Sequence, residues 1–244
     1  MSKKYEAALA LIEKGKTYSV AEAVELVKKT NTVKFDGSVS ISFNLGIDAR
    51  QADQQLRGTL VLPHGNGKTK KILAITSSKV AEATEAGADY VGGKELLQKI
   101  QSENWFDFDG VTFSEEDTVL TLSTCCRKYD KANSGNQRLG ELGRMGKILG
   151  PKGLMPNPKT GTVTPNIGAA VKEIKNGKIE YRTDKEGNMH IMLGKVSFSN
   201  EDLAENVQTV IDTVIRVKPA AQKGTYIKKA VLHSVMGPAI HLAI

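Results

Sequence analysis

The chain has 244 residues, with 34 Lys and Arg against 27 Asp and Glu, so its formal net charge is +7. This length can bury one large core or two modest ones, and the positive charge favours a polyanionic partner. No apolar run reaches the ~18 residues of a membrane span, and charges interrupt the N-terminal segment too early for a secretory signal. The only two cysteines, Cys125 and Cys126, are adjacent and offer no disulfide framework. We therefore expect a reduced, cytoplasmic protein.

The first third of the chain predicts short helices followed by strands. Residues 5–14 have the spacing of a short helix, and Ser19-Val20-Ala21-Glu22 has the form of a capping box that opens a second one. Apolar and polar residues alternate over 39–45, which is typical of a half-buried strand. Residues 56–62 predict another strand, which ends at Pro63.

The middle of the chain changes to an alternation of strands and helices. Residues 71–76 form a short apolar run, compatible with a strand buried on both faces. A predicted helix over 79–86 ends at Gly87, a strand follows at 90–91, and another helix covers 94–101. This order indicates a small α/β unit with parallel strands.

The run GPKGLMPNPKTGTVT at 150–164 separates this unit from the rest of the chain. It holds three prolines, three glycines and two lysines. Proline cannot donate a backbone hydrogen bond and glycine weakens regular structure, so the run cannot continue a helix or a central strand. We expect a shaped, basic connection here.

The last third predicts a helix over 167–176, a hairpin of 178–182 and 189–193 around a turn at 184–188, a helix over 201–217 and a strand over 228–233. The predicted fold class is α/β with two domains. Residues 1–69 and 160–244 would form a discontinuous α+β domain from both chain ends. Residues 70–159 would form an inserted, Rossmann-like, three-layer α/β domain, with a hinge at the two crossings.

Several long motifs occur in an order that resembles one family, that of the first protein of the large ribosomal subunit ("ribosomal protein L-one", the bacterial-type stalk protein). Besides the run at 150–164 they are NLGID at 44–48, QQLRGT at 54–59, VLPHG at 61–65, AGADYVGG at 86–93, GKVSF at 194–198 and KGTY at 223–226. Periodicity alone would not distinguish this family from another basic α/β protein.

The resemblance implies a non-enzymatic, structural constituent of the large ribosomal subunit. Such a protein binds large-subunit ribosomal RNA in the mobile stalk, assists release of deacylated tRNA from the exit site and represses translation of its own mRNA. The implied partners are that ribosomal RNA, exit-site tRNA, its own mRNA and other ribosomal components. The resemblance implies no membrane, metal or cofactor, a cytoplasmic location on the ribosome, and a monomer when off the ribosome.

RNA recognition needs cations for phosphates, small residues where the backbones approach, and polar groups for the 2′-hydroxyl or base edges. Three clusters supply these and match the RNA face that the resemblance implies. They can also be read as a strand entry, a solvated turn and solubilising charge. The family usually has threonine where this chain has Val235. The candidate RNA-binding residues are Lys34, Phe35 and Ser38; Arg182, Asp184, Lys185, Gly187 and His190; and Lys223, Gly224, Ser234, Met236 and Gly237. Candidate hinge or RNA-facing residues are Lys68, Lys152, Pro156, Lys159 and Thr160.

Residues 110–138 do not fit this resemblance. Thr-Leu-x-Thr-Cys at 121–125, followed by Arg138, resembles the active-site strand of sortase-type cysteine transpeptidases. The alternative function is then an enzyme in which Cys125 is the nucleophile and Arg138 steadies the oxyanion. The fragment is too short for the barrel of such an enzyme, and the only histidine upstream, His64, lies within the ribosomal pattern. We therefore expect no enzymatic activity.

Overall fold

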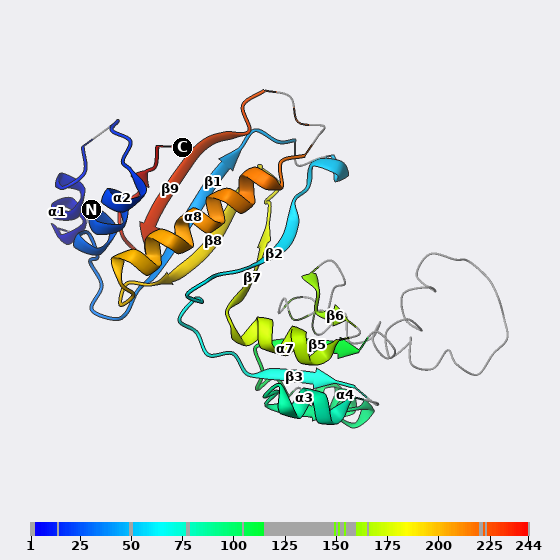
Figure 1. The fold of residues 1–244 in the computed structure, drawn as a ribbon. Helices are drawn as coiled ribbons and strands as arrows, with labels where there is room; N and C mark the ends of the chain where they lie inside the picture. Colours follow the sequence, from blue (N-terminus) through cyan, green and yellow to red (C-terminus); the bar gives the residue numbers. More distant parts are fainter. Residues whose placement is uncertain are drawn as a thin grey trace. The chain divides into compact units, whose positions relative to one another are not determined.

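The computed structural model describes residues 3–13, 15–48, 51–76, 79–103, 105–114, 149, 151, 154, 160–164, 166–219, 222 and 224–243. Helices and strands are mixed throughout this part of the chain, which confirms the α/β class. The chain divides into two compact units, Met1–Lys68 with Asn176–Ile244, and Thr69–Lys175 (Figure 1). No helix among the described residues is long and apolar enough to cross a bilayer.

The first unit is built on an antiparallel sheet in the order β10-β9-β1-β8. Its strands are β1 (Ser38–Leu45), β8 (Asn188–Lys195), β9 (Ile227–Ser234) and β10 (Ile240–His241). The predicted alternation over 39–45 is confirmed, because the odd-numbered residues of β1 are buried and the even-numbered ones are partly exposed. The central strand therefore comes from the N-terminal part of the chain, and both of its neighbours come from the C-terminal part.

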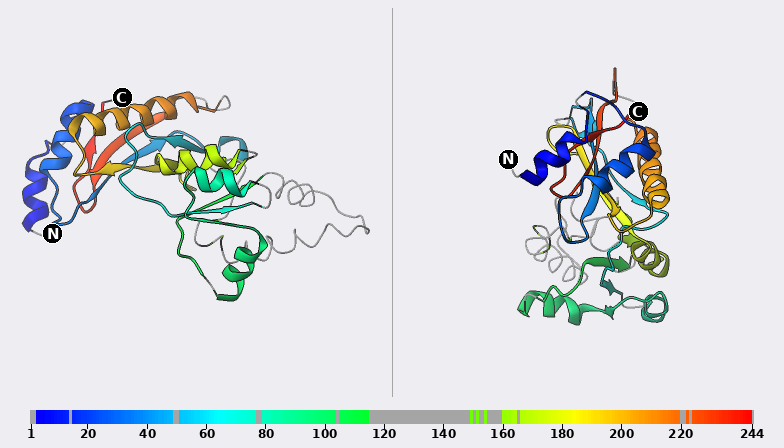
Figure 2. Two further views of the ribbon diagram at one scale, coloured as in Figure 1. Left: turned by 60° about the horizontal axis from the view of Figure 1, so that its bottom comes forward. Right: turned by 90° about the vertical axis from the view of Figure 1, so that its left-hand side faces the viewer.

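Helices cover one face of this sheet. α2 (Val20–Lys29) and α8 (Asn200–Arg216) contact each other and the strands, and α8 lies along β1 and β8 (Figures 1 and 2). The predicted capping box is confirmed, since the Ser19 side chain accepts from the Glu22 backbone and the Glu22 side chain accepts from Ser19. A shorter helix, α1 (Lys3–Ala10), precedes α2. Neither α2 nor α8 packs on the opposite face of the sheet, which carries polar residues.

The predicted hairpin of 178–182 and 189–193 is only partly right. β7 (Lys178–Arg182) pairs with β2 (Arg57–Val61), which follows a short 3-10 helix, η1 (Ala52–Gln54), whereas β8 pairs with β1. β7 and β8 meet only at the turn, where Thr183 bridges to Met189 and the Asp184 backbone N–H donates to the Asn188 carbonyl at 2.8 Å. The two arms diverge because each finds its hydrogen-bond partner on a different N-terminal strand.

The second unit contains a parallel sheet in the order β4-β3-β5-β6. Its elements are β3 (Ile72–Ile75), α3 (Val80–Glu85), β4 (Tyr90–Gly92), α4 (Lys94–Glu103), β5 (Gly110–Ser114), β6 (Val163–Thr164) and α7 (Ile167–Lys175). Leu73 and Ile75 pack with Ile100 of α4, whereas Ile72 and Ala74 pack against α3 and α7. Helices therefore cover both faces of the sheet, and β3 is buried on both, as its apolar run predicted.

The boundary between the units differs from the expected one. Residues 160–175 were assigned to the first domain, but in the structure they belong to the second unit. β6 pairs with β5, and the apolar side of α7 (Ile167, Val171 and Ile174) packs into the core beside β3. The physical reason is burial, because this amphipathic helix completes one helical layer of the parallel sheet. β5 itself was not predicted, since it begins in the segment that resembled no ribosomal motif.

Candidate nucleic-acid interface

The first predicted cluster and residues 234–237 of the third come together at one end of the antiparallel sheet. The loop before β1 and the turn after β9 are neighbours there because Val39 pairs with Ser234. The Val235 backbone N–H donates to the Ser38 carbonyl at 3.0 Å. The Thr32 hydroxyl donates to the Met236 carbonyl at 3.4 Å, across 204 positions in the sequence. This end of the sheet therefore gathers Lys34, Phe35, Ser38, Ser234, Met236 and Gly237.

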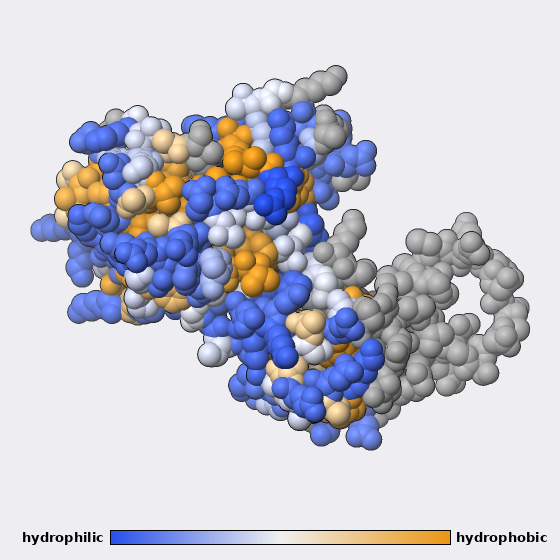
Figure 3. Space-filling model, viewed as in Figure 1, coloured by the Kyte–Doolittle hydropathy of each residue, from blue (hydrophilic) through white to orange (hydrophobic). Residues whose placement is uncertain are grey.

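Two large apolar side chains project into solvent at this end. Met236 is 74% exposed and Phe35 is 59% exposed. Among the other described residues of the first unit, such exposure is scattered over Leu11, Val61 and Ile215, and the view in Figure 3 shows hydrophobic residues interspersed with hydrophilic ones. Met236 also has φ of 58°, the left-handed region, where it is alone among the described non-glycine residues. That conformation costs roughly 1–2 kcal/mol and is typical of functional sites.

The loop that carries Phe35 is held in place by polar contacts. The Asp36 carboxylate accepts hydrogen bonds from the backbone N–H and the hydroxyl of Ser197, at 3.1 and 3.0 Å. The Lys195 ammonium donates to the Asp36 carbonyl at 3.1 Å. Phe35 is therefore presented to solvent by a fixed backbone, while the Lys34 side chain beside it is exposed.

Two residues at this end that were predicted to contact RNA, the buried Ser234 and the partly exposed Gly237, have a structural role. Ser234 is 1% exposed, so its hydroxyl is not offered to a ligand. A Cβ on Gly237 would lie 2.2 Å from the Ser234 Oγ, so a side chain at that position would force the Ser234 hydroxyl to move. Both residues shape the turn that displays Met236.

The second predicted cluster lies at the opposite end of β1. Arg182, Asp184 and Lys185 are exposed there. Gly187 has φ of 78°, and its Cβ would lie 3.2 Å from the carbonyl oxygens of Leu45 and Ile47. Its backbone C=O also accepts from Leu45 N–H at 3.1 Å. Gly187 is thus required to pack the turn on β1, a sufficient reason for glycine without a close approach of RNA.

The remaining candidates fall partly outside the described residues. Gly224 is exposed with φ of 92°. The hydrogen bond from Gly46 N–H to the Tyr226 carbonyl (2.7 Å) brings the segment around Gly224 to the end of β1 where the turn at 184–188 lies. Lys68 is exposed at the end of the first stretch of the first unit. Thr160 is buried in the second unit. The chain re-enters the first unit at 175–176, and not at the expected hinge near residue 160. Lys223, Lys152, Pro156, Lys159, Cys125 and Arg138 lie outside the described residues.

His190 connects the turn with the open face of the sheet. Its Nδ1 lies 2.9 Å from the Ser42 hydroxyl, and its Nε2 lies 3.6 Å from the Asp184 carboxylate. On the same face the Asn44 amide donates to the Asn188 side chain at 3.0 Å, and His233 pairs with Ser40. Burial and, to a smaller extent, the nearby His190 lower the pKa of His233.

Sequence reasoning missed this polar row as a candidate surface. The signal was present, because every polar position in the alternating strand at 38–45 must face away from the core. The partners from β8 and β9 could be added only when the strand pairing was known. The open face, which also holds the partly exposed Met192 and Val231, therefore connects the two ends.

Comparison with known proteins identifies the family of this chain. The model of the ribosomal protein L1p/L10e family matches residues 27–124 and 121–238. The large ribosomal subunit protein uL1 of Mesoplasma florum is 49% identical over 100% of this chain and 98% of its own length. The corresponding proteins of Mycoplasma capricolum and Mycoplasma mycoides are each 50% identical over 98% of this chain and 97% of their own lengths. The chain belongs to the ribosomal protein L1p/L10e family, which confirms the predicted resemblance.

The comparisons also cover residues 110–138, the segment that did not fit the resemblance to the ribosomal family. Both the family model and the relative from Mesoplasma florum match through residues 110–138, and the two matched stretches of the family model meet at 121–124. The match therefore includes the residues that resembled a sortase strand. It places the chain among ribosomal proteins and gives no support to a cysteine transpeptidase.

Proposed function

We propose that this chain is a structural, non-enzymatic constituent of the large ribosomal subunit, and that its first unit binds large-subunit ribosomal RNA. The names of its relatives support the first part. The observation that carries the second is the exposure of both Met236 and Phe35 at one end of the antiparallel sheet, with Met236 in a strained backbone conformation. Folding does not explain why such a pair faces water, whereas a ligand with stacked, partly apolar groups does.

The chemistry of the two ends suits folded RNA. Phe35 and Met236 would pack on a base or ribose face, and Lys34 would contact a phosphate. At the other end Arg182 and Lys185 would neutralise phosphates, and Asp184 would accept from a 2′-hydroxyl or a base amino group. β1 has eight residues and therefore spans roughly 25 Å, so the two ends would contact different segments of one RNA fold.

The finer parts of the function follow from the family resemblance. The RNA segment would be that of the mobile stalk, and the protein would assist release of deacylated tRNA from the exit site. It would also repress translation of its own mRNA by binding a segment of similar fold. Within this proposal the first unit is the RNA-binding domain, the second unit is the inserted domain, and the protein acts on cytoplasmic ribosomes as a monomer when unassembled.

The test compares binding to the stalk fragment of large-subunit ribosomal RNA with binding to an unrelated hairpin of equal length. We expect a preference for the stalk fragment that persists from low to near-physiological salt. Met236→Ala and Phe35→Ala should each weaken that binding by about 1–3 kcal/mol without changing its salt dependence, since they remove stacking and not charge.

Ile215→Ala is the matched control, because Ile215 is a similarly exposed apolar residue of the same unit on α8. It should leave the affinity unchanged. Equal, salt-labile binding of the wild-type protein to both RNAs would contradict specific recognition and leave only polyanion binding.

A further inference from the structure

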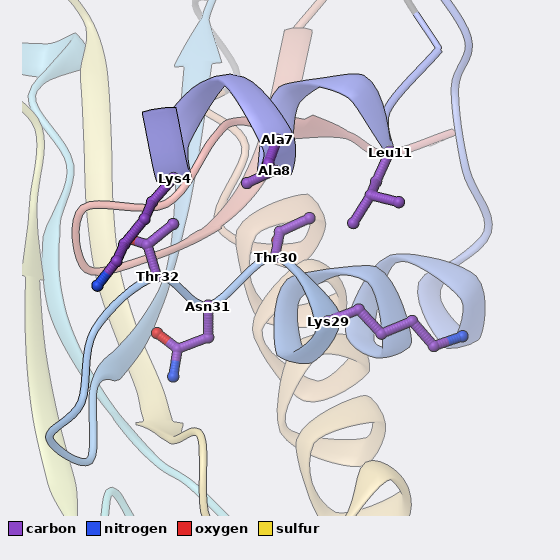
Figure 4. A pocket seen from close by; sticks show the side chains of 8 residues that line it. All are labelled: Lys4, Ala7, Ala8, Leu11, Lys29, Thr30, Asn31 and Thr32. Carbon is purple, nitrogen blue, oxygen red and sulfur yellow. The ribbon is translucent and has the colours of Figure 1, made fainter. Parts of the chain in front are cut away.

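A cavity of about 330 Å³ lies between α1 and the segment that follows α2 (Figure 4). Ala7 and Ala8 of α1 and Leu11, which directly follows it, form its apolar side, while Asn31 and Thr32 contribute polar groups from the segment after α2. None of the side chains that line it is acidic. Its volume is at the small end of the ~300–1,000 Å³ of ligand pockets, so it fits a ligand of about one nucleotide.

The two lysines that line the cavity differ in whether their ammonium groups have a partner within the protein. Lys29 forms an ion pair with Glu25 at 3.4 Å, and its ammonium points away from the cavity (Figure 4). Lys4 reaches from α1 toward Asn31 and Thr32, and no described residue forms an ion pair or hydrogen bond with it (Figure 4). A cation without an internal partner, next to neutral polar groups and an apolar wall, suits a phosphate attached to a flat or apolar group.

The polar groups beside Lys4 retain hydrogen-bonding capacity toward a ligand. The Asn31 side-chain oxygen accepts from Val33 N–H at 3.4 Å, which leaves its NH₂ group to donate. The Thr32 hydroxyl donates to the Met236 carbonyl at 3.4 Å, which leaves its oxygen to accept, for example from a ribose 2′-hydroxyl.

The same Thr32 contact makes the cavity continuous with the proposed interface. Thr32 lines the cavity on one side and touches the Met236 turn on the other. An RNA strand that crosses Phe35 and Met236 would therefore reach the cavity with its next nucleotides.

We propose that this cavity is a nucleotide subsite of the RNA interface, with Lys4 on a phosphate, Asn31 and Thr32 on ribose or base polar atoms, and Ala7 and Leu11 against the ribose or base face. The proposal rests on the proposed function, because it takes its ligand from the same RNA. It extends the interface from the sheet to the N-terminal helix, which no sequence motif indicated.

The test uses the full-length protein and the stalk RNA fragment, with Lys4→Gln compared with Lys3→Gln. The two substitutions remove the same charge from adjacent positions of α1, but only Lys4 lines the cavity. We expect Lys4→Gln to weaken binding several-fold and to reduce the slope of log affinity against log salt by about 0.7–0.9, the value for one lost phosphate contact. Lys3→Gln should leave the slope unchanged.

A second pair of variants tests the space itself. Ala7→Leu places a larger side chain in the cavity and should weaken binding about tenfold with no change in the salt slope. Ala10→Leu is its control, because Ala10 is exposed on the same helix and does not line the cavity. Both should keep the wild-type thermal unfolding midpoint.

The outcomes separate this inference from the proposed function. Specific binding by the wild-type protein, with equal effects of Lys4→Gln and Lys3→Gln and no effect of Ala7→Leu, would overturn the subsite and leave the proposed function intact. Failure of the wild-type protein to prefer the stalk RNA would overturn both.

Discussion

Met236 is the residue at which stability and the proposed function conflict. Its left-handed backbone is unfavourable for any side chain with a Cβ, and its side chain is the most exposed large apolar group described in the chain. Gly237 and the buried Ser234 hold the turn in the shape that produces both features.

Met236→Gly should therefore stabilise the folded protein by up to about 1 kcal/mol while it weakens stalk RNA binding. Met236→Ala should weaken binding to a similar extent with no gain in stability, because alanine keeps the Cβ. Urea unfolding and RNA titration of the two variants would check this. A loss of stability in Met236→Gly would show that the Met236 side chain supports the fold.

His64 gives the first unit a pH-dependent contact. A hydrogen bond from its Nε2 to the Glu205 carboxylate (2.7 Å) is the main cause that raises the pKa of His64, and Asp202 at 3.5 Å adds to it. A raised pKa in the folded state means that protonated His64 stabilises the fold below its ordinary value of 6.5. That contribution is lost as the pH rises through the raised pKa.

We expect His64→Gln to lower the thermal unfolding midpoint more at about pH 5.5 than at about pH 8.5. The effect should be small and should shrink with salt, because the pair is exposed to solvent. Glu205→Gln should return the His64 pKa toward its ordinary value in an NMR titration. Equal losses at both pH values would exclude the ionic contribution.

At the scale of elements, one buried polar side chain of α8 adds hydrogen bonds to the apolar packing of this helix on the sheet. The Asn206 amide donates to the carbonyls of Leu193 (3.0 Å) and Gly65 (3.2 Å). Its side-chain oxygen accepts from His64 N–H at 3.3 Å. A single residue thus joins a helix, a strand and the loop before the second unit.

Asn206→Ala should lower the free energy of unfolding by about 2–3 kcal/mol, because it removes three hydrogen bonds and takes this partner from the buried Leu193 carbonyl and from the backbone of His64 and Gly65. Gln208→Ala on the exposed side of α8, where Asp212 is the one described partner of the Gln208 side chain, should change it by less than about 0.5 kcal/mol. Chemical denaturation of both variants measures the difference. Similar effects of the two would mean that water replaces the Asn206 contacts.

At the scale of the whole molecule, the chain crosses between the units at two neighbouring places. A Cβ on Gly177 would lie 2.7 Å from the Gly65 Cα, so the outgoing and returning segments touch within the first unit. Among the described residues, none from 69–175 belongs to the apolar core of the first unit. We therefore expect the first unit to keep its core when the second unit is removed.

A variant in which a short glycine linker replaces residues 69–175 should fold and keep the preference for the stalk RNA. Circular dichroism, cooperative unfolding and the RNA comparison described above would check this. An unfolded product would show that the first unit needs the inserted one. A folded product without RNA preference would move the proposed interface away from the sheet.

The sequence by itself determined the elements whose cause is local. The capping box at Ser19 and the alternation in β1 depend on hydrogen bonds and side-chain directions within a few residues, and both are in the structure. The buried strand β3 was also readable, because a run that is apolar at every position must be covered on both faces. The long motifs determined the family, which the relatives confirm.

Tertiary structure decided the pairing and the surfaces. β7 and β8 separated because their partners, β2 and β1, lie far away in the sequence, and α7 joined the second unit because its apolar side completes a core there. Burial of Ser234, exposure of Met236 and the cavity beside Lys4 each depend on segments that only folding brings together. Local patterns record which side of an element is apolar, but long-range packing decides which neighbour covers that side and which polar residues remain free for a ligand.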